Sequence, residues 1–124
     1  KILLDSRLGG VKFVGSTQGG KSVASLTGQN MRKSTFELGG SDPFIVSEHA
    51  NIDLAVEKAV ASRLANNGQA CINAKRFIIH SRHFNEFSTK LIEKIRLLNI
   101  GDPMDPFSDI GPLAVKHLYE QLKQ

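Results

Sequence analysis

The residues best suited to covalent chemistry are Cys71, the only cysteine in the chain, and Glu37, which ends a predicted strand beside two glycines. Cys71 lies in "NNGQACINAKRF" (residues 66–77), between a Gly-Gln turn and a segment typical of a buried strand. A thiolate is a strong nucleophile, and a carboxylate beside an apolar strand can have a raised pKa suited to accepting a proton. Two simpler interpretations remain open, a small core residue for Cys71 and a salt bridge for Glu37.

A second candidate is a phosphate-binding loop. Gly15, Gly20, Lys21 and Ser22 match the pattern G-x-x-x-x-G-K-[ST], in which main-chain N–H groups surround a phosphate and the lysine reaches its terminal oxygens. A nucleotide hydrolase of this kind also needs an acidic residue at the end of another strand to hold magnesium, and only Glu48 comes near such a position.

The same loop has two other interpretations. Ser16 or Thr17 could simply cap a helix, with Lys21 in solvent. Alternatively, the N–H groups of the helix end and the Ser16 hydroxyl could bind the pyrophosphate of a dinucleotide without hydrolysing it.

Alternating apolar and helical patterns predict an α/β fold with parallel strands, whose carboxyl ends carry the ligand-binding loops. The predicted strands cover residues 11–14, 34–38, 43–46 and 76–79. Four helices are predicted. The first runs from the "GSTQGG" segment to Gly28, and the second from a cap at Asn51 or Asp53 to about residues 66–68. The third covers residues 84–98 and carries a core-facing apolar stripe, and the fourth begins at residue 115. The proline-rich residues 101–112 are expected to be irregular.

Composition excludes several classes of function. The net charge is +4, but the basic residues are dispersed along the chain, as is typical of a solvated surface. Lys75 and Arg76 are neighbours and are also expected to lie on this surface. No nucleic acid partner is therefore expected. No apolar run is long enough for a membrane span. A single cysteine excludes an internal disulfide and fits a cytoplasmic protein. His80 and His83 lack further ligands, so no metal is expected.

Three motifs, in order, resemble those of the aldehyde dehydrogenase superfamily. "FVGSTQGGK" (residues 13–21) resembles its cofactor loop, "FELGGSDPFIV" (residues 36–46) its E-L-G-G signature, and "NNGQACINAKRFI" (residues 66–78) its G-Q-x-C segment. "GDPMDPFSDIGPL" (residues 101–113) also resembles a loop of this superfamily, and the cysteine segment leans toward its succinate-semialdehyde dehydrogenase branch. The resemblance covers essentially the whole chain and favours dinucleotide binding over phosphate hydrolysis.

The resemblance implies an enzyme that oxidises an aldehyde to a carboxylic acid with NAD or NADP. Cys71 would be the nucleophile, its main-chain N–H part of the oxyanion hole, and Glu37 the general base. Gly15 and Ser16 would lie near the pyrophosphate.

Within the same loop Gly20 would allow close packing, while Leu38 and Gly39 would adjoin the nicotinamide. Residues 1–38 would end the dinucleotide-binding domain, and residues 39–124 would begin the catalytic domain.

The parent enzyme would be a homo-oligomer several times longer than this chain. The asparagine that completes the oxyanion hole and the ribose contacts would lie outside this segment, so the 124 residues alone are expected to be inactive. A non-catalytic structural module is the remaining alternative, and it would give Cys71 no unusual reactivity.

Overall fold

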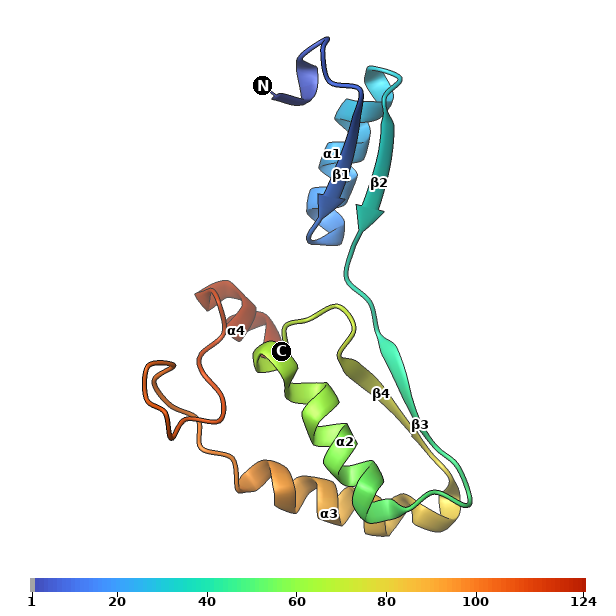
Figure 1. The fold of residues 1–124 in the computed structure, drawn as a ribbon, viewed down its shortest axis with the longest axis vertical. Helices are drawn as coiled ribbons and strands as arrows, with labels where there is room; N and C mark the ends of the chain where they lie inside the picture. Colours follow the sequence, from blue (N-terminus) through green and yellow to red (C-terminus); the bar gives the residue numbers. More distant parts are fainter. Residues whose placement is uncertain (1) are drawn as a thin grey trace. The chain divides into compact units, whose positions relative to one another are not determined.

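A computed structural model describes residues 2–124 and confirms an α/β chain built on parallel strands (Figure 1). The chain divides into two compact units after Gly40, close to the boundary predicted after Leu38. The assignment of the two parts to a cofactor-binding and a catalytic domain remains a prediction. Within residues 2–124, no helix combines the length and the apolar character needed to cross a membrane.

The first unit is a strand–helix–strand motif. It consists of a short 3-10 turn, η1 (Ile2–Leu4), followed by β1 (Gly10–Val14), α1 (Thr17–Gln29) and β2 (Lys33–Glu37). The strands are parallel, with Val14 opposite Glu37, so both predicted strands are confirmed except that Leu38 lies just beyond β2. This register brings the loop after β1 next to the end of β2.

Alternation of side chains explains how α1 and the two strands fit together. Phe13 of β1 and Phe36 of β2 are half-buried, and their rings lie 6.4 Å apart. Thr27 of α1 is completely buried, and its hydroxyl donates to the Val23 carbonyl (3.1 Å) and lies 3.3 Å from the Ser34 hydroxyl of β2. The buried hydroxyl is therefore satisfied inside the helix and against the strand, as a buried polar group must be.

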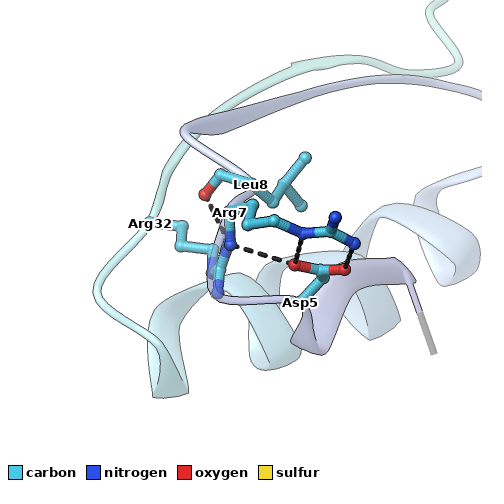
Figure 2. A network of polar contacts seen from close by, with 4 residues as sticks. All are labelled: Asp5, Arg7, Leu8 and Arg32. Atoms are coloured by element: carbon cyan, nitrogen blue, oxygen red, sulfur yellow. Dashed lines mark hydrogen bonds and ion pairs between the residues drawn. The ribbon is translucent and has the colours of Figure 1, made fainter.

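Two arginines order the loop before β1 (Figure 2). The Arg7 guanidinium binds the Asp5 carboxylate with two hydrogen bonds, Nε to Oδ1 at 3.0 Å and Nη2 to Oδ2 at 2.7 Å. The side-chain bonds from Arg7 lower the pKa of Asp5 to about 2. Arg32, just before β2, donates to the Leu8 carbonyl and so ties this loop to the start of the second strand.

The end of α1 differs from the predicted stop at Gly28. The helix continues to Gln29, Asn30 caps it, and Met31 takes a left-handed conformation with φ of 52°. The Met31 N–H bonds the Gly28 carbonyl (3.0 Å) and the Arg32 N–H bonds the Thr27 carbonyl (2.9 Å). This is a Schellman motif, in which the left-handed position is usually glycine.

Replacing Met31 with glycine is expected to stabilise the protein, because a left-handed conformation strains any residue with a Cβ atom. We expect Met31→Gly to raise the free energy of unfolding by about 0.5–1 kcal/mol in urea denaturation. Met31→Ala keeps the Cβ and serves as the control with little change. A Met31→Gly protein no more stable than Met31→Ala would contradict this account of the helix end.

The second unit contains another strand–helix–strand motif. Its main elements are β3 (Asp42–Val46), α2 (Ile52–Leu64), β4 (Ala74–Ile79), α3 (Phe84–Arg96) and α4 (Lys116–Leu122), with 3-10 turns η2 (Ala65–Gly68) and η3 (Ser81–His83). Strands β3 and β4 are parallel. Of the two predicted caps, Asn51 begins α2, since its side chain accepts the Leu54 N–H at 3.0 Å.

The core of this unit forms where α2 and α3 meet the sheet. Its buried members come from β3, α2 and α3, and they are Val46, Ile52, Val56, Ala59 and Phe87. The predicted core stripe of α3 is only partly right. Phe87 is buried and Leu91 packs against the core, but Phe84 and Ile95 are 56% and 39% exposed, because only the middle of α3 packs on this cluster.

Candidate active site

Cys71 lies on an exposed turn between η2 and β4. The Asn73 N–H bonds the Ala70 carbonyl at 3.3 Å, which places Cys71 and Ile72 at the two corners of the turn. Ile72 is 75% exposed. The interpretation of Cys71 as a small core residue is therefore wrong within this unit.

A run of left-handed residues reverses the chain before this turn. Asn66, Asn67 and Gly68 have φ of 51°, 55° and 73°, a conformation that asparagine and glycine tolerate best. Two side chains next to the turn bind residues that follow α3 in the sequence. Asn67 Oδ1 accepts the Gly111 N–H (3.1 Å), and Gln69 Oε1 accepts the Ala114 N–H (3.0 Å), so residues 111–114 support the Cys71 turn.

Asn73 fixes the other side of the turn. It is only 1% exposed, and its amide nitrogen donates to the carbonyls of Arg63 (3.1 Å) and Ala65 (2.8 Å) at the end of α2. Next to it, the Ala74 N–H donates to the Ser62 hydroxyl (3.3 Å). Asn73 was missed in the sequence, because nothing in its type or spacing distinguishes it from an exposed loop asparagine.

In the first unit, contacts between main-chain and side-chain atoms bring several of the predicted cofactor residues together. The Gly15 N–H donates to the Glu37 carbonyl at 3.0 Å, so the loop after β1 and the end of β2 meet. Leu38 packs on Gly20, where an added Cβ would lie 2.6 Å from Leu38 Cδ2. The predicted close packing at Gly20 is therefore seen between α1 and the residue after β2.

The remaining residues of this unit are more open. Glu37 is exposed at its strand end. Nothing lies within 4 Å of the position that a Cβ on Gly39 would take. Glu37 and Gly39 belong to the first unit and Cys71 to the second, so the pairing of nucleophile and base remains a prediction.

The start of α1 fits an anionic group but not a phosphate-hydrolysing loop. Ser16 caps the helix, and its hydroxyl accepts the Gly19 N–H at 3.1 Å, while the Gly20 N–H already bonds the Ser16 carbonyl at 2.8 Å. The helix begins at Thr17, so residues 17–20 form its first turn rather than an extended cradle. The N–H groups of Thr17 and Gln18 remain at the positive end of the helix.

A sequence model described as "Aldehyde dehydrogenase family" matches residues 1–124. The chain belongs to the aldehyde dehydrogenase family. Over 116 residues it is 47% identical to a protein of Mycobacterium avium named succinate-semialdehyde dehydrogenase (NADP(+)), a match that covers 94% of this chain and 25% of that protein. This membership replaces the phosphate-loop hydrolase as the interpretation of residues 15–22.

Solved structures give the same family. The succinate-semialdehyde dehydrogenase from Burkholderia pseudomallei is 34% identical, with a TM-score of 0.92 over 98% of this chain and 25% of that one. The NAD+ complex of an aldehyde dehydrogenase from Bacillus cereus is 28% identical, with a TM-score of 0.93 over the same shares. The chain thus spans about a quarter of the length of these aldehyde dehydrogenases.

The contact between Gly20 and Leu38 predicts a stability difference between two glycines of α1. Gly20→Ala would push Leu38 away, and we expect it to lower the free energy of unfolding by about 1–2 kcal/mol. Gly28→Ala, where nothing lies within 4 Å, should instead raise it by about 0.5–1 kcal/mol through helix propensity. Urea denaturation of both proteins measures this, and equal changes would contradict the packing role of Gly20.

The buried amide of Asn73 predicts a large effect of an isosteric change. Asn73→Asp replaces a donor by a carboxylate oxygen facing two carbonyls, and we expect a loss of about 3 kcal/mol in the free energy of unfolding near neutral pH. Asn30→Asp is the matched control, because Asn30 donates to the Leu26 carbonyl from an exposed position. Its loss should stay below about 1 kcal/mol, since water replaces the bond. Equal losses would show that Asn73 does not anchor the turn.

Proposed function

We propose that the complete protein is an NAD(P)-dependent aldehyde dehydrogenase that oxidises an aldehyde to a carboxylic acid with Cys71 as its nucleophile. Membership of the family carries this proposal. The exposed position of Cys71 on a turn anchored at both ends supports it, because a nucleophile has to reach its substrate and keep a fixed direction. The segment alone, without the rest of such an enzyme, is not expected to turn over.

The proposed reaction begins at Cys71. The thiolate attacks the aldehyde carbon and forms a carbon–sulfur bond, while the main-chain N–H of Cys71 donates to the developing oxyanion. The bound dinucleotide supplies the acceptor for the hydride that leaves this carbon. Water then attacks the resulting thioester, the carbon–sulfur bond breaks, and the acid leaves with the thiolate restored.

Glu37 is the proposed general base. It would accept the proton of the thiol and later the proton of the attacking water. Its exposed side chain at the carboxyl end of β2 supports this role, since the ends of parallel strands are where α/β proteins bind their ligands.

The proposed cofactor contacts lie at the start of α1. The N–H groups of Thr17 and Gln18 and the Ser16 hydroxyl would receive the pyrophosphate of NAD or NADP, since a helix N-terminus favours negative charge. At Gly15 a Cβ atom would lie 2.8 Å from the Phe13 ring, so glycine lets the main chain pass close to this ring beside the proposed pyrophosphate site. Leu38 and Gly39 would adjoin the nicotinamide.

Succinate semialdehyde with NADP is the proposed substrate pair, ahead of other aldehydes and NAD. The support comes from relatives 44–47% identical that are named succinate-semialdehyde dehydrogenase (NADP(+)). The structural match named as an NAD+ complex is less similar, at 28% identity.

Substitution of the two proposed catalytic residues tests the function in the complete enzyme. Cys71→Ser should lower kcat by about 10³-fold or more, because an alcohol is a far weaker nucleophile than a thiolate, and Glu37→Gln by about 10²-fold or more. The measurement is reduction of NADP+ with succinate semialdehyde. Glu48→Gln removes another exposed carboxylate, one that lies 3.8 Å from Arg82, and should leave kcat near the native value. Native turnover by the Cys71→Ser enzyme would refute the proposed chemistry.

A further inference from the structure

Lys75 makes an unusual pair of contacts with the turn that carries Cys71. It is the second residue of β4, half-buried, and its ammonium donates to the carbonyls of Cys71 (2.8 Å) and Ala70 (3.3 Å). The side chain therefore turns back toward the preceding loop instead of extending into solvent. Lys75 is thus a partly exposed surface residue, as predicted, but one whose ammonium is bound to this turn.

These two carbonyls belong to the peptide groups on either side of the Cys71 Cα atom. In a planar trans peptide the C=O and the N–H point in opposite directions. Because both carbonyls point to one ammonium, the N–H groups of Cys71 and Ile72 point away from Lys75. Within residues 2–124 neither N–H has a hydrogen-bond acceptor. The Cys71 N–H, which would bind the oxyanion, is thus left without an acceptor in this part of the chain, and its direction is set by the bond between the Ala70 carbonyl and Lys75.

The neighbouring Arg76 shows that this arrangement is particular to Lys75. Arg76 Nε donates to the Ser41 carbonyl at 2.8 Å and so links β4 to the start of β3, and within residues 2–124 its side chain makes no hydrogen bond to the turn. Asn73 also anchors the turn, but its side-chain amide donates to the carbonyls of Arg63 and Ala65 and not to the peptide groups of Cys71. Among the side chains that the structure describes, only that of Lys75 bonds both peptide groups at the cysteine.

We propose that Lys75 is a positioning residue for catalysis, whose ammonium sets the main-chain direction of Cys71 and thereby aims both its N–H and its thiol. This inference rests on the proposed function of Cys71. The lysine would act through the two carbonyls without touching substrate or cofactor. Its loss should therefore lower kcat and leave the affinity for NADP almost unchanged, because the proposed cofactor contacts belong to α1.

The test compares three substitutions in the complete enzyme. Lys75→Met removes the donors and keeps the stem, and we expect kcat to fall by about tenfold to a hundredfold with the KM for NADP changed by less than about twofold. Lys75→Arg keeps a charged donor and should restore kcat to within about threefold of native. Lys58→Met is the control, since it removes an equal charge from an exposed ion pair with Glu57.

Several outcomes would overturn the role of Lys75. These are native kcat in Lys75→Met, equal losses in Lys75→Met and Lys75→Arg, or a KM for NADP that rises in step with the loss. If Lys75→Met does not fold, Lys75→Gln, which keeps one neutral donor, takes its place with a smaller loss expected and native kcat as the refuting result. Cys71→Ser is measured alongside. An inactive Cys71→Ser enzyme with an unimpaired Lys75→Met enzyme refutes only the positioning role, whereas an active Cys71→Ser enzyme refutes the proposed function itself.

Discussion

The buried amide of Asn73 is the interaction on which the Cys71 turn depends. The carbonyls at the end of a helix have no partner within the helix, and burying them without one is costly. Asn73 donates to two such carbonyls from the residue just before β4, and so joins the end of α2 to the start of the strand. Because both ends of the turn are fixed, Cys71 can stand exposed and still keep one direction.

In the first unit, close packing holds the loop after β1 and the end of β2 in place. The parallel register places Val14 opposite Glu37, and the bond from the Gly15 N–H continues the pairing by one residue. Gly20 then lets Leu38 lie against the first turns of α1. A proposed base and a proposed pyrophosphate loop are thereby held at one sheet edge, where the helix end favours an anion.

Local signals predicted most of the elements in this chain. The caps Ser16 and Asn51 and the apolar alternation of the strands locate α1, α2 and the four strands to within a few residues. The end of α1 was missed because the Schellman motif uses Met31, a residue with no turn preference. The exposed ends of the α3 stripe were missed because periodicity shows which residues share a face, and not how much of that face is covered.

The candidate site was only partly predictable. Cys71 and Glu37 were distinguished by residue type and by their place beside predicted strands, and their catalytic roles stay predictions. The supporting residues Asn73 and Lys75 could not be found in this way, since their roles depend on contacts with main-chain carbonyls. The match to a phosphate-hydrolysing loop rested on residue types alone, and the alternative of a helix capped by Ser16 is the one that the structure shows.

The central claim, that Cys71 carries the substrate through the reaction, has a direct test in covalent trapping. The complete enzyme would be mixed with succinate semialdehyde and NADP+, quenched in acid within the first turnover, and digested for mass spectrometry. The account predicts a succinyl thioester on the peptide that contains Cys71. Formation of NADPH with that peptide unmodified, or with the acyl group on another residue, would contradict it.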